Sequence, residues 1–279
     1  MTRLLRYRHD GFTFDVSDEG PLDGDPVVLL HGFPERNTCW RGVVPLLHAQ
    51  GLRTYAPDQR GYSPGARPPR RRDYTMDKLE NDAVALIETI GRPVHLVGHD
   101  WGANSGWLLA AHRPDLARTW TAISVPHPAA FRRAMFSTRQ AFSSWYMGAF
   151  QTPRVPERLA AKRGGRFDRG LRNGGMTRDE VDRFHREVVE YGALPGALNW
   201  YRAMPFAHQR ALADKVEVPT TFLWSDGDVA ITRQSVDLCA EHVTGPYELR
   251  VLEGASHWIP SQEPEAVADA VLARIGSVA

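Results

Sequence analysis

Residues 97–104 read VGHDWGAN and place a carboxylate at the centre of a turn that usually carries a serine. Gly98, Asp100 and Gly102 have the small-x-nucleophile-x-small spacing of a nucleophile elbow. A strand-like segment, 94–98, precedes Asp100 and a helix-like segment follows it, which is the order that such an elbow requires. An ordinary strand-to-helix turn with Asp100 as a helix cap is the alternative, but it does not explain the paired glycines.

The carboxylate restricts the chemistry. Attack of Asp100 on a carbonyl carbon would give a labile anhydride, which is a poor route to ester or amide hydrolysis. Attack on a saturated carbon gives an alkyl ester, which water can then hydrolyse at the Asp100 carbonyl. Asp100 therefore indicates substitution at an sp³ carbon, with an epoxide oxygen or a halide as the leaving group.

Hydrolysis of that ester requires a base, and His257 has the best position among the 11 histidines. It follows the last strand-like segment, 247–252, and the order of nucleophile first and histidine last is typical of serine-type hydrolases built on a parallel sheet. The histidine needs an orienting carboxylate. Asp226 and Asp228 both follow a strand, and we choose Asp228 because Asp226 is better placed to shape an Asp-Gly turn.

Backbone N–H groups must stabilise the oxyanion that forms when the ester is hydrolysed. The segment HGFPE at 31–35 follows a strand, so the N–H groups of Phe33 and Trp101 are the candidate donors. The same segment could be no more than a tight turn with a cis bond before Pro34.

The elements that position these residues alternate between strand and helix. Apolar, β-branched segments predict strands buried on both faces, at 12–16, 27–31, 53–57, 94–98, 119–125, 221–225 and 247–252. A helix is predicted over 75–91, ending at Gly91. The pattern indicates an α/β fold with a mostly parallel, doubly wound sheet.

Strand-like segments are absent between about residues 128 and 211. Helices are predicted there over 131–150, over 177–191 behind a capping box, and over 196–204, with a Gly- and Arg-rich loop at 160–175. We therefore predict a core of residues 1–128 and 212–279, and a helical cap domain of residues 129–211.

Composition excludes several classes of protein. The 279 residues are 42% hydrophobic and 24% charged with a net charge of +1, which predicts no general attraction to nucleic acid or to an anionic membrane. No apolar run approaches the ~20 residues of a membrane span, and the N-terminus lacks the apolar region of a signal peptide. Cys39 and Cys239 form no disulfide framework. We expect a cytoplasmic monomer or homodimer.

With these residues identified, the sequence resembles the soluble epoxide hydrolases of the α/β-hydrolase superfamily. The segments that carry the resemblance are HGFPE, DQRGYS at 58–63, GHDWGA at 98–103, LNWYR at 198–202 and GASHWIPSQEPE at 254–265. The resemblance implies Asp100 as nucleophile, His257 as base and Asp228 as its partner carboxylate. It also implies a small apolar epoxide and water as substrates, with no metal or organic cofactor, in roles such as detoxification.

The same resemblance implies two cap tyrosines that hydrogen-bond the epoxide oxygen. Tyr201 lies in LNWYR, and Tyr146 lies in WYMGAFQTP by a looser alignment. A phenol with a pKa near ~10 keeps its proton at neutral pH and can donate it to an alkoxide; the alternative is that both tyrosines are core packing. An apolar pocket would be walled by Phe33, Pro34, Trp101, Trp145, Trp200 and Trp258.

Two other functions remain open. A haloalkane or haloacid dehalogenase shares the Asp nucleophile and the cap, but haloalkane dehalogenases usually have Asn where Phe33 stands, and fluoroacetate dehalogenases Arg where Trp101 stands. A non-catalytic ligand-binding homologue would bind an epoxide without consuming it. A serine esterase is disfavoured because the elbow lacks Ser or Cys, and no phosphate-binding motif supports a nucleotide-dependent enzyme.

Overall fold

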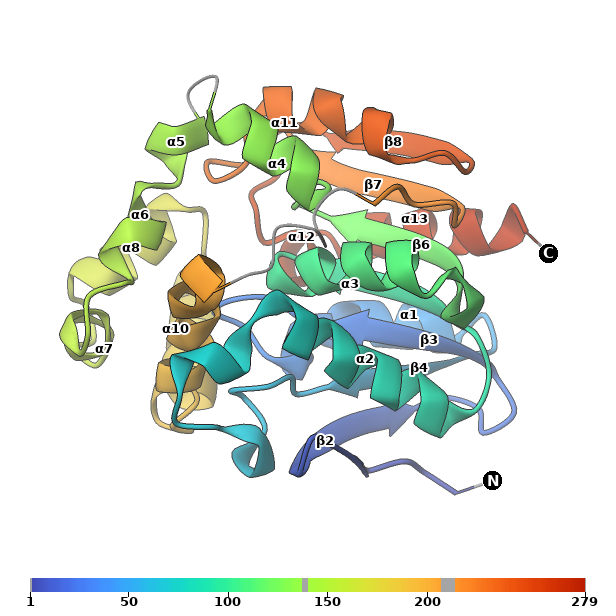
Figure 1. Cartoon of the computed structure of the whole chain (residues 1–279), viewed down its shortest axis with the longest axis horizontal. Coiled ribbons are helices and arrows are strands. Elements are labelled where there is room, and N and C mark those ends of the chain that lie inside the picture. The colour runs from blue at the N-terminus through green and yellow to red at the C-terminus, as the bar shows by residue number, and fades with distance from the viewer. Residues whose placement is uncertain (1, 137–139, 207–213, 279) are drawn as a thin grey trace.

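Eight strands form one sheet in the order β1-β2-β4-β3-β5-β6-β7-β8 in the computed structural model, which describes residues 2–136, 140–206 and 214–278 (Figure 1). The strands are β1 (Arg6–His9), β2 (Phe12–Glu19), β3 (Asp25–Leu30), β4 (Leu52–Pro57), β5 (Val94–His99), β6 (Ala117–Ile123), β7 (Thr220–Ser225) and β8 (Tyr247–Leu252). β2 is antiparallel to both of its neighbours, and the pairs from β4 to β8 are parallel. The predicted doubly wound, mostly parallel sheet is therefore confirmed.

Central strands are buried along their whole length. Every residue of β4, β5 and β7 is buried, as near-continuous apolar segments of a parallel sheet require. β1 was not among the predicted strands. Its sequence, RYRH, is short and charged, which is characteristic of an edge strand that must not pair with another molecule.

Helices cover both faces of the sheet. On one face α2 (Met76–Ile90), α3 (Trp101–His112) and α11 (Arg233–Asp237) pack on a cluster that includes Ile87 and Trp107. On the other face α1 (Val43–His48) and α13 (Pro264–Gly276) pack on a cluster that includes Leu47 and Val271. As predicted, α2 ends at Gly91, whose φ is 82°. No helix among the described residues is long and apolar enough to cross a lipid bilayer.

Between β6 and β7 the described chain is helical. The helices are α4 (Pro128–Met135), α5 (Gln140–Ser143), α6 (Trp145–Ala149), α7 (Val155–Ala160), α8 (Arg166–Asn173), α9 (Arg178–Phe184) and α10 (Leu194–Ala203). α5 to α8 form the left edge of the molecule in Figure 1. A third apolar cluster joins α10 to the loops after β3 and β5, because Trp200 and Tyr201 pack with Phe33 and Trp101. This helical segment therefore lies over the carboxyl ends of the central strands.

Two predictions within this segment are wrong. The helix predicted over 131–150 is divided, since α5 and α6 are separate and Ser144 lies between them with its hydroxyl accepting from Gln140. The backbone of Ser144 has φ of −95° and ψ of 9°, which departs from helical geometry and ends α5. The loop predicted at 160–175 contains α8, whose Phe167 and Leu171 pack inward despite the surrounding glycines and arginines. The predicted cap boundary at 211–212 lies outside the described residues.

α3 packs unusually close to the sheet at its glycines. A Cβ atom at Gly102 would lie 2.2 Å from the carbonyl oxygen of Leu30, and one at Gly106 would lie 2.1 Å from the Trp120 ring. A Cβ at Gly98 would lie 2.5 Å from the Gly102 carbonyl oxygen. The paired glycines of the elbow are therefore required by close approach of backbone to backbone.

We predict that Gly106→Ala lowers the free energy of unfolding by about 1–3 kcal/mol, because the indole of Trp120 must move in a packed core. Gly170→Ala in α8 is the matched control, since its Cβ would enter open space. That control should be neutral or stabilise by up to about 1 kcal/mol. Urea denaturation of both variants measures the difference, and equal stabilities would contradict the close packing.

Candidate active site

Asp100 occupies a strained turn between β5 and α3. Its φ of 51° and ψ of −116° are rarely adopted by a residue with a side chain, and such strain concentrates at functional sites. The carboxylate Oδ1 accepts a 2.7 Å hydrogen bond from the Phe33 N–H. Gly32 makes this possible, because a Cβ there would lie 2.4 Å from the Asp100 Cβ. The turn thus fixes one carboxylate oxygen on a backbone donor.

His257 joins two carboxylates. Its Nδ1 donates to Asp228 Oδ2 at 2.7 Å, and its Nε2 lies 3.6 Å from Asp100 Oδ2. The other oxygen of Asp228 accepts from the N–H groups of Ala230 and Ile231, which fix the carboxylate. Loops after β5, β7 and β8 thus bring the three predicted residues together at one edge of the sheet, where parallel sheets commonly place their sites.

Asp226, the alternative carboxylate, lies elsewhere. It is exposed, and its Oδ1 accepts from the Gly254 N–H at 2.7 Å. It therefore ties the loop after β7 to the loop after β8, while Asp228 contacts His257.

Charge coupling governs the protonation of this group. Burial alone would lower the pKa of His257, but the carboxylates of Asp228 and Asp100 raise it to about 10. Burial alone would raise the pKa of Asp100, but the nearby His257 charge lowers it below its usual value. At neutral pH the resting group is therefore an imidazolium between two carboxylates.

Tyr146 of α6 and Tyr201 of α10 lie beside this group. Their rings meet edge to face at 6.0 Å between centroids. Burial and the charges of Asp100 and Asp228 raise the pKa of Tyr146. Burial, Tyr146 and the charge of Asp100 raise the pKa of Tyr201. Both phenols are therefore protonated at neutral pH, and the charge of Asp100 contributes to this.

Trp101 contacts Tyr201 through its side chain. The two rings meet edge to face at 4.9 Å between centroids. Because Trp101 is the first residue of α3, the helix offers no acceptor for its backbone N–H. This N–H belongs to the residue that directly follows Asp100.

Most of the predicted aromatic residues surround the site at different depths. Phe33, followed by a cis bond to Pro34, packs on Tyr201 at 5.1 Å between centroids. Trp200 packs on the Trp101 ring, and its indole N–H donates to the Arg60 carbonyl. Trp200 therefore supports Trp101. Trp258 packs edge to face on the His257 ring, with its indole N–H bound to the Gly174 carbonyl.

Trp145 does not wall the pocket, and that prediction is wrong. The side chain is 73% exposed. Trp145 and Tyr146 are consecutive on α6, and consecutive side chains of a helix point about 100° apart. The turn that directs Tyr146 inward therefore directs Trp145 into solvent.

Sequence reasoning missed the residues that fix the His257 backbone. The His257 carbonyl accepts from His99 Nε2 at 3.0 Å and from the Ser124 hydroxyl at 2.9 Å. Burial and the charge of His257 lower the pKa of His99 to about 4, so it remains a neutral donor. Ser124 follows β6 with a φ of 66°. Its place after a central strand was the available signal.

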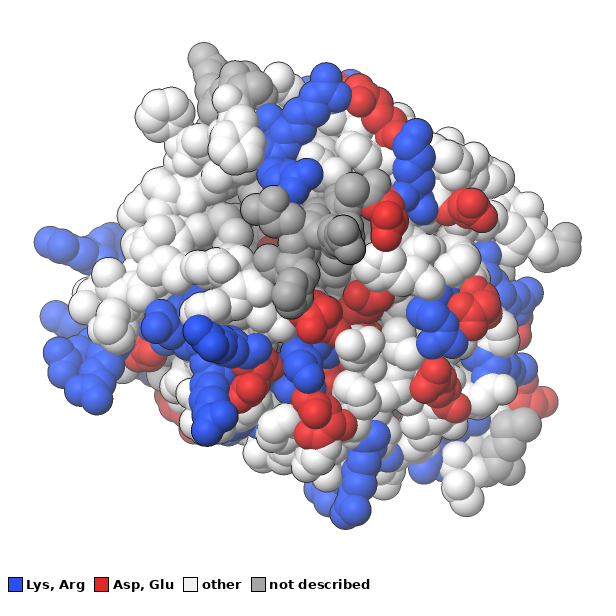
Figure 2. Space-filling view, in the orientation of Figure 1, with Lys and Arg blue, Asp and Glu red and all other residues white. Residues whose placement is uncertain are grey.

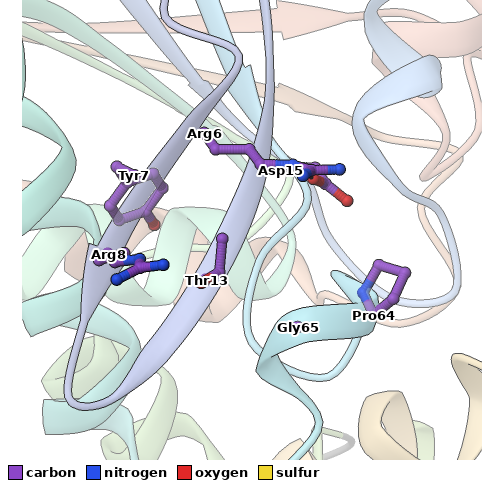
Figure 3. A pocket seen from close by; sticks show the side chains of 7 residues that line it. All are labelled: Arg6, Tyr7, Arg8, Thr13, Asp15, Pro64 and Gly65. Carbon is purple, nitrogen blue, oxygen red and sulfur yellow. The ribbon is translucent and has the colours of Figure 1, made fainter.

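A separate hollow of about 680 Å³ lies between the β1–β2 hairpin and Gly65 and is lined by none of these site residues (Figure 3). Its one carboxylate, Asp15, is already paired with Arg6 at 2.7 Å, and it has no histidine. It is therefore a surface groove without a catalytic pair. Within the described residues, no cluster of three His, Cys, Asp or Glu side chains is arranged to hold a metal ion.

Known proteins are similar to this chain in sequence and fold. The model of the alpha/beta hydrolase family matches residues 27–270. Epoxide hydrolase 3 of Xenopus tropicalis is 33% identical over 94% of this chain and 74% of its own length. Epoxide hydrolase A of Mycobacterium tuberculosis is 31% identical over 94% of each chain. The crystal structure of epoxide hydrolase VrEH1 from Vigna radiata superposes with a TM-score of 0.84 at 28% identity, covering 98% of this chain and 97% of its own. The predicted α/β-hydrolase fold is thereby confirmed.

Nuclear magnetic resonance of the imidazole nitrogens tests the charge coupling. We predict that His257 stays protonated up to about pH 10, as its raised pKa requires. Asp228→Asn should lower this pKa because it removes a negative partner. Asp226→Asn is the matched control and should leave it unchanged. A titration near the ordinary value of about 6.5 in the wild type would contradict the coupled group.

Proposed function

The chain belongs to the α/β-hydrolase family, and we propose that it is an epoxide hydrolase that opens a small apolar epoxide to a vicinal diol. The observation that carries this proposal is that Tyr201 packs on Phe33 and Trp101, the two residues that flank the Asp100 carboxylate, and that Tyr146 packs on Tyr201. Burial raises the pKa of both phenols, so they are protonated. An epoxide needs both parts, because its leaving oxygen stays in the molecule and must receive a proton. Named epoxide hydrolases among the relatives support the same reaction.

Ring opening begins at Asp100 Oδ2. The Phe33 N–H holds Oδ1, so Oδ2 is the oxygen left to attack a ring carbon. The new ester bond forms as the ring C–O bond breaks, and that electron pair moves to the ring oxygen. The ring oxygen takes a proton from Tyr146 or Tyr201, which leaves a hydroxyalkyl ester and a tyrosinate.

Loss of the Asp100 charge drives the next step. In the resting enzyme this charge raises the pKa of both tyrosines and of His257. Once Asp100 is an uncharged ester, the tyrosines become better acids and the imidazolium gives up its proton more readily. The proton of His257 then returns to the tyrosinate through solvent, and His257 becomes a neutral base.

Ester hydrolysis restores the resting state. His257, oriented by Asp228, takes a proton from water, and the resulting hydroxide attacks the Asp100 carboxyl carbon. The oxyanion forms on Oδ1, where the Phe33 N–H is already in place, with the Trp101 N–H as second donor. The bond between the carboxyl carbon and the ester oxygen then breaks, and the departing alkoxide takes the second proton of the water. The diol therefore leaves neutral, the first proton stays on His257, and Asp100 is again a carboxylate.

The arrangement favours an epoxide over a haloalkane. A departing halide needs no proton, so two protonated tyrosines beside the carboxylate would have no role in its release. The ligand-binding alternative is disfavoured by the complete Asp100, His257 and Asp228 group.

The wider organisation completes the proposal. The helices between β6 and β7 act as the cap domain, with Tyr146 and Tyr201 as its contribution to the reaction. The pocket is walled by Phe33, Trp101 and the other inward aromatic residues. Cys39 and Cys239 are free and buried, which suits a reducing compartment such as the cytoplasm. A monomer or homodimer is part of the same proposal.

We predict that Tyr146→Phe with Tyr201→Phe slows ring opening of an aryl epoxide by at least about 100-fold, because no acid remains for the alkoxide. Each single variant should retain partial activity. Tyr191→Phe is the control, since Tyr191 lies in the same helical segment but packs against Arg36. Diol formation and single-turnover alkylation measure the effect. An unchanged alkylation rate in the double variant would contradict the proposed acids.

A further inference from the structure

Charge is distributed unevenly between the two parts of the chain. Residues 129–211 contain 15 Lys and Arg but only 7 Asp and Glu, whereas the remainder contains 19 and 26. The net charge of +1 is therefore the sum of a strongly basic helical segment and an acidic core. The net charge predicted no general attraction to anionic surfaces, but that value averages over the chain and does not describe the basic helical segment.

The outer face of α7 and α8 concentrates this positive charge. Lys and Arg side chains project from the left edge of the molecule in Figure 2, where Figure 1 places these two helices. Six exposed cations of this region form no ion pair with a carboxylate of the described residues: Arg154, Arg158, Lys162, Arg166, Arg169 and Arg172. Its two carboxylates, Glu157 and Asp168, are engaged by Arg202 and His185.

Large apolar side chains are exposed along the same edge. Val155 and Leu159 of α7 are 49% and 42% exposed, and their i,i+4 spacing places them on one side of the helix. Phe142 of α5 and Trp145 of α6 are 82% and 73% exposed. Single exposed apolar residues are common, but aromatic tips beside unpaired cations are typical of surfaces that dock on lipid.

We propose that this outer cap face, formed by α5 to α8, docks on the surface of an anionic lipid bilayer. The cations would meet lipid headgroups, and Phe142, Trp145, Val155 and Leu159 would enter the interface. Charge complementarity alone would also suit a nucleic acid. The exposed aliphatic side chains favour lipid, because a bilayer offers an apolar interior to bury them and the backbone of a nucleic acid does not.

Docking would bring the proposed active site close to the bilayer surface. The benefit of this placement rests on the proposed function. α6 carries Trp145 on its outer side and Tyr146 on its inner side, so one short helix separates the docked face from the proposed acids. Apolar epoxides partition into lipid. An enzyme held at the surface by its cap would meet them where they are concentrated.

Co-sedimentation of the full chain with vesicles tests docking without turnover. We expect binding to vesicles of equal parts phosphatidylcholine and phosphatidylglycerol, little binding to phosphatidylcholine alone, and weakening by salt. Arg166→Ala with Arg169→Ala should lower the partition coefficient about 30-fold. Arg8→Ala with Arg70→Ala, two exposed cations of the core, is the matched control and should have little effect.

Trp145→Ser tests whether the Trp145 side chain inserts into the lipid interface. Leu22→Ser is its control, because Leu22 is an exposed apolar residue outside the helical segment. Trp145→Ser should also lower the partition coefficient, while circular dichroism shows an unchanged fold. Absence of binding to the mixed vesicles, or equal partition of the two arginine double variants, would overturn the proposal. Binding to duplex DNA as strong as to vesicles, with no effect of Trp145→Ser, would replace lipid by a polyanion. None of these measurements depends on epoxide turnover. A failure of the docking proposal can therefore be distinguished from a failure of the proposed function.

Discussion

The buried negative charge of Asp100 is the feature on which the rest of the site depends. A buried carboxylate is costly unless it is paired and hydrogen-bonded. Here the Phe33 N–H and the His257 charge stabilise it, and Asp228 stabilises that charge in turn. The strained backbone of Asp100 and the close packing of Gly102 against β3 hold the carboxylate where these partners meet. The fold and the neighbouring charges thus both stabilise the Asp100 carboxylate in one position.

The reaction that we propose uses residues from two parts of the chain, so the position of one part relative to the other matters. The core supplies the nucleophile and base, and the helical segment supplies both acids. Arg183 of α9 donates to buried Glu35 at 2.6 Å, and Ser261 donates to the same oxygen. Gly61 and Gly196 meet backbone to backbone, where a Cβ at Gly196 would lie 2.5 Å from its neighbour. These contacts join the helical segment that carries Tyr201 to the core that carries Asp100.

The sequence allowed prediction of whatever depends on local pattern. Buried strands, the helix ending at Gly91 and the elbow glycines each have a short-range signal, and Asp228 was preferred over Asp226 from turn chemistry. Trp145 was misplaced because its direction depends on the phase of α6, which residue type does not reveal. His99 and Ser124 were missed because their partner, the His257 carbonyl, comes from a distant loop. The segregation of charge was visible in the sequence but was hidden by the net value.

The most direct test of the central claim uses His257→Gln, in which alkylation of Asp100 should proceed and hydrolysis should stall. After exposure to an aryl epoxide, intact-protein mass should increase by the whole epoxide, and peptide mapping should place the adduct on Asp100. The double variant with Asp100→Ala should gain nothing. An adduct on another residue, or none from any epoxide of a modest panel, would contradict the account, and an alkyl adduct formed only from a primary haloalkane would assign the protein to the dehalogenases.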